Sequence, residues 1–502
     1  MSSQIKAGAI ISYVSIGINI LIGLLYTPWM ISSIGKEDYG IYILATSVIT
    51  IFLFDFGLGS AVTRFISRYL AEKRVDKVNK FLGIVAKLYL SIDLFFVCIL
   101  SGVYFFIPEI YKELTPDEIE KFKVVYVIVA SYSILSFPFI PLDGVITAHE
   151  KFVQLKLAEL FNKIFVVVTM AACLCVGYGL YALVLVNTVA GILTILIKLA
   201  VIRKCTEVEL DISYRNKNEL KEIASYSGWV TVTALAQRLI FNIAPTILGI
   251  VSGSVEIAVF GIAMTFEGYV FSFANALNGL FLPRVTHLTL NDDGNSVLPL
   301  MIRVGRIQIF IIGLLILGFV GVGHDFINLW IGPDFSSVYE CTIFLIIPSF
   351  FFLPQFIGSN AILAQNKVKS QAYVFLIMGL FNVIVGYFLA DRFGALGFSI
   401  SVFLAYTIRT IGTDIIFKRN LNIDVLSFFK ESFLSMSQAV ILALIMTILI
   451  YVYIPADNWV MFCVKAMLVV LSYLFSFWFF GFKQDEKAQL LSSLRTIFSK
   501  GN

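Results

Sequence analysis

Charged residues are scarce in this sequence, and histidine is nearly absent. Lys, Arg, Asp and Glu make up 14% of the 502 residues, and there are three histidines, whereas a soluble domain has about 25% charged residues. Hydrophobic residues make up 59% and include 47 Phe. A soluble fold could not hide this much apolar surface, because its exterior must face water. The composition excludes a disordered chain and a nucleic-acid-binding domain, and it predicts that most of the chain lies in lipid.

Signatures of catalysis and of metal binding are also missing. The six cysteines form no CxxC pair and lie mostly in apolar runs, which is typical of reduced, buried thiols. The histidines form no HExxH pattern, and no nucleophile elbow or acidic pair stands in a polar segment. We therefore predict no catalytic residue, no metal and no cofactor beyond coupling to H+ or Na+. A membrane enzyme, such as a polymerase with large catalytic outer loops, is disfavoured because no loop is long.

Long apolar runs take the place of the missing polar stretches. A helix crosses a bilayer core of about 30 Å with about 20 apolar residues. The runs predict an all-α, polytopic membrane protein with fourteen transmembrane helices, numbered here as spans one to fourteen. Their approximate bounds are 9–33, 40–63, 81–107, 123–146, 154–177, 180–201, 224–250, 256–281, 301–323, 340–363, 371–390, 394–417, 433–455 and 459–482. Tight connections are predicted at Tyr178-Gly179 and at Asp391-Arg392-Phe393.

Basic residues concentrate in alternate loops. The loops that follow even-numbered spans hold 22 Lys and Arg, whereas the odd-numbered loops hold five. Because Lys and Arg in short loops mark the cytoplasmic side, both termini are predicted to be cytoplasmic. Residues 483–502 are predicted to form an interfacial amphipathic tail, with one apolar face formed by Leu490, Leu491, Leu494, Ile497 and Phe498.

The chain repeats over about half its length. Segment 148–151 follows span four, and the similar segment 364–367 follows span ten at an offset of 216 residues. Several such pairs align spans one to six with spans seven to twelve. The predicted domains are an N-terminal six-helix bundle (1–201), a cytoplasmic linker (202–223), a C-terminal six-helix bundle (224–417), the last two helices (418–482) and the tail (483–502). Repeats of this kind are typical of transporters, with a substrate site expected between the halves.

Three motifs resemble those of bacterial polysaccharide exporters. The segment Ile34-Gly35-Lys36-Glu37-Asp38-Tyr39-Gly40-Ile41-Tyr42 resembles their first loop, and Asp55-Phe56-Gly57-Leu58-Gly59 followed by Arg64 resembles their second helix. The turn Leu282-Pro283-Arg284 is also similar to theirs. Over nearly its whole length the chain resembles the Wzx-type O-antigen and repeat-unit flippases of the multidrug/oligosaccharidyl-lipid/polysaccharide (MOP) exporter superfamily.

The resemblance implies two six-helix bundles in a V, two further helices, and a place in the bacterial cell inner membrane. It also implies a flippase that moves undecaprenyl-pyrophosphate-linked oligosaccharide repeat units from the cytoplasmic to the outer leaflet by alternating access. The implied partners are that glycan, membrane lipids and other polysaccharide assembly proteins, and no nucleic acid. A lipid II flippase and a drug or cation antiporter of the same superfamily are the alternatives. Lipid II flippases carry arginines in span one, where this chain has no Arg or Lys between Lys6 and Lys36.

Ionisable residues inside the spans are costly and are functional candidates. A central cationic cavity would bind the diphosphate, because Arg offers bidentate contacts and Lys a point charge. Its predicted residues are Arg64, Lys87, Lys163, Arg238 and Arg409. Two other interpretations stay open: Lys87, Lys163 and Arg409 could reach the headgroups, and Arg238 could pair with Glu267 near mid-membrane.

Three acids and two prolines complete the predicted site. Asp55, Asp93 and Glu267 are predicted either to couple transport to an ion or to pair with nearby bases. Pro28 and Pro245 lie in corresponding spans of the two repeats and are predicted hinges, since proline removes a helix hydrogen bond. The alternative is that both are static kinks.

Overall fold

The chain is helical throughout the part that the computed structural model describes, and that part contains no strand. The described residues are 17, 20, 23–52, 58–206, 208, 211, 214, 231–232, 234–240, 242–278, 281, 285, 288, 296–365 and 367–488. Asp55, the turn at 282–284, most of the predicted linker and residues 489–502 of the predicted tail lie outside this set.

Ten of the described helices, or unbroken helical runs, are long and apolar enough to cross a membrane. They are Val75–Ile110, Pro116–Ala148, Phe152–Cys175, Leu180–Cys205, Ser254–Asn275, Leu298–Trp330, Pro333–Ala364, Val368–Asn420, Val425–Tyr453 and Trp459–Gly481. An eleventh is added if the bent pair Ala234–Ile240 and Ala244–Val251 forms one span. The all-α, multi-pass architecture is thereby confirmed, whereas the count of fourteen spans and the cytoplasmic termini stay predictions.

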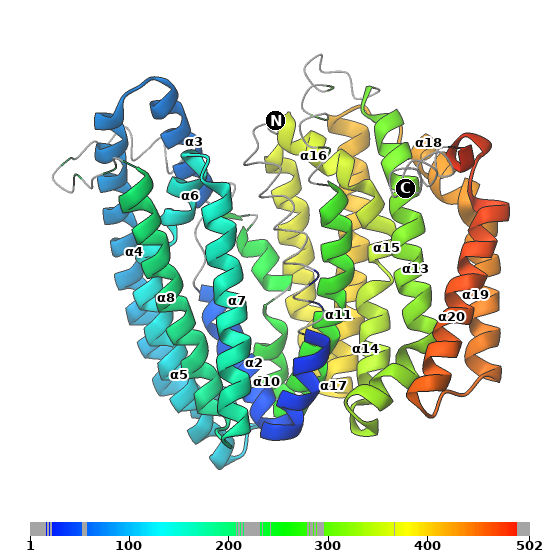
Figure 1. Ribbon diagram of the computed structural model, residues 1–502, viewed down its shortest axis with the longest axis horizontal. Helices are drawn as coiled ribbons and strands as arrows, with labels where there is room; N and C mark the ends of the chain where they lie inside the picture. The colour runs from blue at the N-terminus through cyan, green and yellow to red at the C-terminus, as the bar shows by residue number, and fades with distance from the viewer. Residues whose placement is uncertain are drawn as a thin grey trace, which may run out of the picture. The chain divides into compact units, whose positions relative to one another are not determined.

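Both predicted tight connections are present. Helix α7 (Phe152–Cys175) packs along α8 (Leu180–Cys205), as Figure 1 shows, and the chain turns between them at Gly177 with φ 90°. Helix α17 (Val368–Asn420) consists of two helical pieces joined at Gly394, whose φ of 57° and ψ of −138° are not helical. A residue with a Cβ would be strained at both glycines, because this φ region favours glycine. At both glycines the backbone leaves the helical conformation, which allows the chain to turn within a few residues.

The described chain divides into two compact units. The first comprises residues up to Gly261 together with Ala372–Val402, and the second comprises Ile262–Gln371 and the chain from Phe403 onward. Helices α11 (Ser254–Asn278) and α17 contribute to both units. The predicted bundle boundaries at 201, 224 and 417 stay predictions.

The first unit is built mainly from long apolar helices. They are α2 (Lys36–Phe52), α3 (Leu58–Ala71), α4 (Val75–Ile110), α5 (Pro116–Ser136), α6 (Pro141–Ala148), α7, α8 and α10 (Ala244–Val251). Helix α5 begins with a capping box, in which Thr115 accepts from the backbone N–H of Glu118 and Glu118 accepts from that of Thr115. This pairing satisfies two N–H groups that an uncapped helix would leave without a partner. A core of Phe65, Phe81, Tyr89 and neighbouring apolar residues joins α3 to α4.

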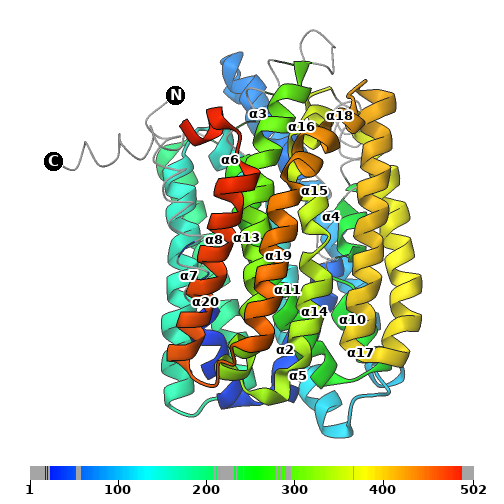
Figure 2. The same cartoon turned by 90° about the vertical axis from the view of Figure 1, so that its right-hand side faces the viewer.

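The second unit is organised around one long helix, α13 (Leu298–Trp330). The following segment comprises η4 (Pro333–Phe335), α14 (Ser337–Ile346), α15 (Ser349–Phe352), η5 (Leu353–Gln355) and α16 (Phe356–Ala364). After α17 come α18 (Val425–Phe429), the π-helical turn η6 (Lys430–Leu434), α19 (Ser435–Tyr453), α20 (Trp459–Ser476) and a second π-helical turn, η7 (Phe477–Gly481). Helices α19 and α20 pack against each other and against α13 (Figure 2).

The internal repeat is visible in the local structure. A 3₁₀ turn with a central proline, η1 (Phe137–Phe139), interrupts the helical run of predicted span four, and η5 interrupts span ten. Helices α6 and α16, which follow these turns, end at Ala148 and Ala364. The two interruptions are separated by the 216-residue offset of the sequence repeat. Pro138 and Pro354 therefore occupy equivalent sites, where proline prevents a regular helix.

A buried arginine ties the end of the chain to α13. Arg306 is 3% exposed, and its guanidinium donates to both carboxylate oxygens of Glu486 at 2.6 and 2.8 Å. It also donates to the Glu431 carbonyl at 3.1 Å, to the Gly481 carbonyl at 2.9 Å and to the Ser435 hydroxyl. Glu431 and Gly481 belong to the π-helical turns η6 and η7, where the ordinary helix hydrogen-bond pattern is interrupted. Arg306 thus fixes α19 and α20 to α13 at one end.

A second buried ion pair joins the same helices nearer the other end of α13. Lys465 of α20 is 2% exposed and donates to Asp325 of α13 at 2.6 Å. Its ammonium also lies 5.1 Å from the centre of the Tyr451 ring of α19. Two buried pairs, well separated along α13, hold the last two long helices as one body with it.

We expect the Arg306→Ala protein to lose about 3–5 kcal/mol of unfolding free energy, as when one partner of a buried ion pair is removed. Arg306→Lys should lose less, since charge is kept but the bidentate fork is lost. Thermal unfolding in detergent measures both, with Ile307→Ala, an exposed position on the same helix, as control. An Arg306→Ala protein as stable as the control would contradict the role of this pair.

The same pair predicts a pH dependence. Partial burial alone would raise the pKa of Glu486, but hydrogen bonds from Arg306 and from the Lys483 backbone N–H hold it below its ordinary value of 4.5. A carboxyl whose pKa is lowered on folding stabilises the protein above its unfolded pKa. This contribution is therefore complete above about pH 4.5 and is lost as the pH falls through the lower folded-state pKa. The stability of the Glu486→Gln protein should not show this fall at low pH.

Candidate functional site

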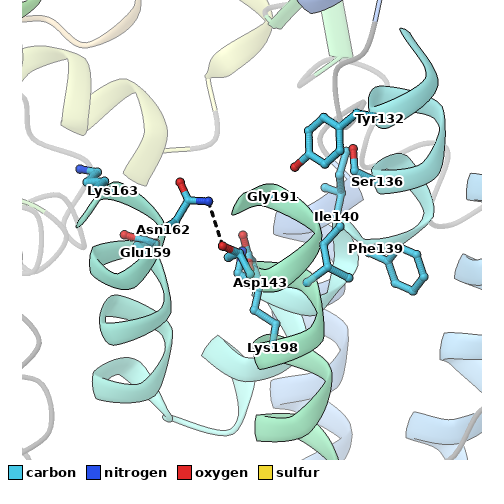
Figure 3. Close-up of a pocket in the computed structure, with 12 residues that line it drawn as sticks. Tyr132, Ser136, Phe139, Ile140, Asp143, Glu159, Asn162, Lys163, Gly191 and Lys198 are labelled. Atoms are coloured by element: carbon cyan, nitrogen blue, oxygen red, sulfur yellow. Dashed lines mark hydrogen bonds and ion pairs between the residues drawn. The ribbon is translucent and has the colours of Figure 1, made fainter. Parts of the chain in front are cut away.

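A polar pocket lies among the apolar helices of the first unit. It has a volume of about 420 Å³, and α5, η1, α6, α7 and α8 contribute to its wall. Its lining residues are Tyr132, Ser136, Phe139, Ile140, Asp143, Glu159, Asn162, Lys163, Gly191, Thr194, Ile195 and Lys198 (Figure 3). Ligand pockets have volumes of about 300–1,000 Å³. The surrounding helices are long and apolar enough to cross a membrane, so the pocket gathers polar groups between helices that are otherwise apolar.

An ion pair between two helices crosses the pocket. Lys198 of α8 donates to the Asp143 carboxylate of α6 at 2.6 Å, and Figure 3 shows the two side chains beside each other. The Lys198 side chain is 16% exposed and that of Asp143 is 51% exposed. Asp143 therefore presents part of its carboxylate to the open side of the pocket, while its charge is compensated by Lys198.

An amide of the pocket lining is held by a hydrogen bond to α8. Asn162 of α7 donates to the Thr194 hydroxyl of α8 at 2.9 Å, and Thr194 donates in turn to the Ala190 carbonyl at 2.8 Å. An asparagine side chain has a second N–H and a carbonyl oxygen. The Asn162 amide can therefore both donate to and accept from a ligand.

A glycine makes room for an aromatic ring in the pocket. Tyr132 of α5 lies against Gly191 of α8, and a Cβ at Gly191 would overlap the Tyr132 hydroxyl. Any larger residue at this position would push the ring away from α8. Gly191 thus sets where the Tyr132 ring lines the pocket (Figure 3).

Lys163 lines the pocket together with its acidic neighbour. Glu159 lies one turn earlier on α7, attracts Lys163 electrostatically, and forms an ion pair with Lys156 at 2.8 Å. The lining contains two lysines, Lys163 and Lys198, and two carboxylates, Asp143 and Glu159. The formal charge of this lining is therefore balanced, and the central cationic cavity stays a prediction.

The other predicted cations of the first unit lie away from this pocket. Lys87 of α4 donates to the Tyr214 carbonyl at 3.0 Å and so contacts the segment that follows α8. Arg64 is exposed on α3. Arg238 donates to the Asn242 side-chain oxygen at 3.2 Å. The structure thus gives these three different surroundings and places only Lys163 of the predicted set in the pocket lining.

The fifth predicted cation belongs to a buried cluster in the second unit. Glu267 of α11 is 2% exposed and accepts from the Tyr406 hydroxyl of α17 at 2.5 Å. Arg409, one turn after Tyr406, attracts Glu267 electrostatically and lies 4.3 Å from the centre of the Phe352 ring. The sequence predicted Glu267 and Arg409 as separate candidates, and the fold brings them together. Arg238 and Glu267 fall in different units, so their pairing stays a prediction.

The remaining predicted residues have structural surroundings. Asp93 is buried on α4, and no described residue makes a hydrogen bond to its Oδ1 atom. Pro28 lies within the helical residues 23–34, and Pro245 stands in the first turn of α10. A proline is tolerated in a first turn because that N–H has no partner in the helix anyway. The hinge role of both stays a prediction. Among the described residues, no three His, Cys, Asp or Glu side chains are grouped to hold a metal ion.

Sequence reasoning missed most of the pocket, although a signal existed. On α7, Asn162 and Lys163 lie three and four residues after Glu159, and on α8, Thr194 lies three residues after Gly191 and Lys198 four residues after Thr194. Residues at this spacing lie on one face of a helix. Two polar helix faces in consecutive apolar spans therefore indicate a shared polar surface, which a search for single charged residues overlooks.

Comparison with known proteins finds one matching family and a curated relative. Residues 5–288 match the family of polysaccharide biosynthesis proteins. The chain is 21% identical over 382 residues to the uncharacterized membrane protein EpsK of Bacillus subtilis (strain 168), covering 73% of each chain. The long apolar helices define a multi-pass membrane protein. Because the family match spans more than half of the sequence, the chain belongs to the polysaccharide biosynthesis protein family.

Solved structures of transporters share its fold. The lipid II flippase MurJ, in an inward closed conformation, has a TM-score of 0.69 and 16% identity, covering 93% of this chain and 97% of MurJ. An inward-facing multidrug resistance transporter of the MATE family in the MOP superfamily has a TM-score of 0.68 and 12% identity, covering 82% and 98%. The eukaryotic MATE transporter AtDTX14 has a TM-score of 0.60 and 15% identity, covering 82% and 94%. The predicted resemblance to MOP exporters is confirmed, and at these identities the structural likeness concerns the fold.

Proposed function

We propose that the protein is a flippase, which moves a lipid-linked oligosaccharide from the cytoplasmic to the outer leaflet of the bacterial cytoplasmic membrane. One observation carries the proposal: an open polar pocket of about 420 Å³, lined by four charged side chains, lies among helices apolar enough to cross a membrane. A glycan cannot cross hydrocarbon unaided, because each unsatisfied polar group there costs several kcal/mol. The pocket supplies hydrogen-bonding groups in place of water while the lipid tail stays in the bilayer.

The anchor of this substrate is proposed to be undecaprenyl pyrophosphate, which carries an anionic diphosphate. Its binding requires cations outside the balanced pocket. The proposed diphosphate-binding residues are Arg64, Lys87, Arg238 and Arg409. Lys163, the fifth predicted cation, lines the pocket. Alternating access would bring the diphosphate-binding residues to each side of the membrane in turn, and Pro28 and Pro245 are the proposed bending points.

Translocation in liposomes tests the proposal. Purified protein is reconstituted with a fluorescent undecaprenyl-pyrophosphate-linked oligosaccharide, and lipid that reaches the opposite leaflet is detected with a membrane-impermeant reagent. We expect movement well above that of protein-free liposomes. Asn162→Leu should slow it about tenfold, because a buried polar group of the substrate would lose its partner. Leu135→Ala, at an exposed position of α5, is the matched control. Equal rates with and without protein would contradict the proposal.

A drug or cation antiporter is the second candidate, because Asp143 and Glu159 line the pocket and Glu267 is buried in the second unit. Carboxylates of this kind can bind an organic cation. Uptake of a fluorescent organic cation by the same liposomes separates the two functions. Lipid II offered in place of the oligosaccharide lipid tests the third alternative in the same assay.

A further inference from the structure

We infer that the pocket formed by α5, α6, α7 and α8 binds an uncharged sugar residue of the lipid-linked oligosaccharide, and does not bind its diphosphate. The inference rests on the proposed function and specifies which chemical part of the substrate this pocket receives. Charge balance, an aromatic ring and fixed hydrogen-bonding groups support it independently.

Both carboxylates of the pocket already have a lysine partner. Lys198 is paired with Asp143 at 2.6 Å, and Glu159 forms an ion pair with Lys156 at 2.8 Å and also attracts Lys163, one turn away on the same helix. A diphosphate entering the pocket would meet two carboxylates as well as two ammonium groups. Like charges placed together disfavour binding, and displacing Asp143 from Lys198 would leave a carboxylate without its partner. An anionic sugar would meet the same obstacle, whereas an uncharged sugar would not.

Tyr132 supplies an aromatic surface for a sugar ring. A sugar has an apolar face formed by its C–H groups, and a tyrosine ring offers a rigid contact surface with a polar tip. The ring lies against Gly191, where no side chain competes for the space. Gly191 therefore leaves the room in which the Tyr132 ring lies. A tyrosine that only faced lipid would not need a glycine opposite it.

Hydroxyl groups of a sugar require partners that can both donate and accept. Asn162 is oriented by Thr194 at 2.9 Å, and its amide keeps one N–H and its oxygen for further hydrogen bonds. Asp143 is 51% exposed while paired with Lys198, so its carboxylate can accept from a hydroxyl. A volume of about 420 Å³ is at the lower end of ordinary ligand pockets, which suits a small part of an oligosaccharide rather than the whole.

Direct binding of soluble probes tests the inference without transport. The full-length protein in nanodiscs is titrated with N-acetylglucosamine, with glucuronic acid as an anionic sugar, and with inorganic pyrophosphate, and binding is followed by saturation-transfer NMR. We expect the uncharged sugar to bind more tightly than the anionic one, and pyrophosphate not to compete with it. Tyr132→Ala should weaken sugar binding about tenfold, since one aromatic contact is lost.

Control variants separate a specific loss of sugar binding from a loss of folding. Tyr181→Ala removes an exposed tyrosine of α8 that does not line the pocket, and it should leave sugar binding unchanged. If Tyr132→Ala does not fold, Tyr132→Phe and Gly191→Ala replace it: the first keeps the ring and should bind, and the second displaces the ring and should not. Competition by pyrophosphate, or unchanged sugar binding after the ring is lost or displaced, would overturn the inference. Failure of the proposed function is distinguishable, because it appears as sugar binding without lipid translocation.

Discussion

Replacement of Arg238 by alanine should slow translocation of the lipid-linked oligosaccharide by about 10- to 150-fold, which corresponds to about 1.5–3 kcal/mol for a hydrogen bond to a charged group. Arg238 donates to the side-chain oxygen of Asn242, which is an uncharged amide. Span one, the counterpart of this span in the repeat, has no cation between Lys6 and Lys36. Of these two corresponding spans, only the one in the second repeat would therefore offer a positive charge, that of Arg238, to the diphosphate. The liposome assay measures the effect.

Two further variants separate transport from structure. Arg238→Lys should be only partly active, because an ammonium replaces a bidentate fork. Arg392→Ala, at an exposed arginine of the same unit, should translocate normally. The double variant Arg238→Ala with Glu267→Ala should be no faster than Arg238→Ala, because Glu267 has Tyr406 as its own partner. Better translocation by the double variant than by either single change would instead make the two residues a structural pair, and full activity of Arg238→Ala would rule out its role.

Removal of Glu267 should destabilise the second unit by about 3–5 kcal/mol, the range for removing one partner from a buried charged pair. The Glu267→Ala change would leave the Tyr406 hydroxyl buried without its acceptor and Arg409 without its nearby anion. Tyr406→Phe should cost less, about 1–3 kcal/mol, since it removes a neutral donor only. Unfolding in detergent measures both. Equal stability of Glu267→Ala and the unchanged protein would contradict this assignment.

The same carboxylate tests ion coupling. Glu267→Gln keeps the size of the side chain but cannot exchange a proton or carry a charge. If Glu267 couples transport to H+ or Na+, this variant should fold and should lose the dependence of translocation on the ion gradient. A normal gradient dependence in Glu267→Gln would leave Glu267 a structural role. Asp55 was predicted alongside it, and Asp55→Asn serves as the parallel test.

Much of the membrane architecture could be predicted from the sequence alone. The cost of placing polar backbone in lipid makes an apolar run of about 20 residues a helix whatever its neighbours are. Ten of the predicted spans, between residues 81 and 201 and from 301 to 482 with the break at Gly394, fall within long described helices, or extend at most two residues beyond their ends, for this reason. The proline-centred interruptions at Pro138 and Pro354 were equally local, since proline disrupts a helix by itself.

The partners of the charged side chains were decided only by the tertiary structure. Lys198 finds Asp143 on another helix, and Glu267 finds Tyr406 across 139 residues of chain. Hydropathy gives the depth of a residue along its helix but not the rotation of that helix about its axis. That rotation is set by packing, such as the close approach of Tyr132 to Gly191. The sequence by itself therefore determined which segments cross the membrane and which charges they carry, whereas helix packing decided that two lysines and two carboxylates would share one pocket with no net charge.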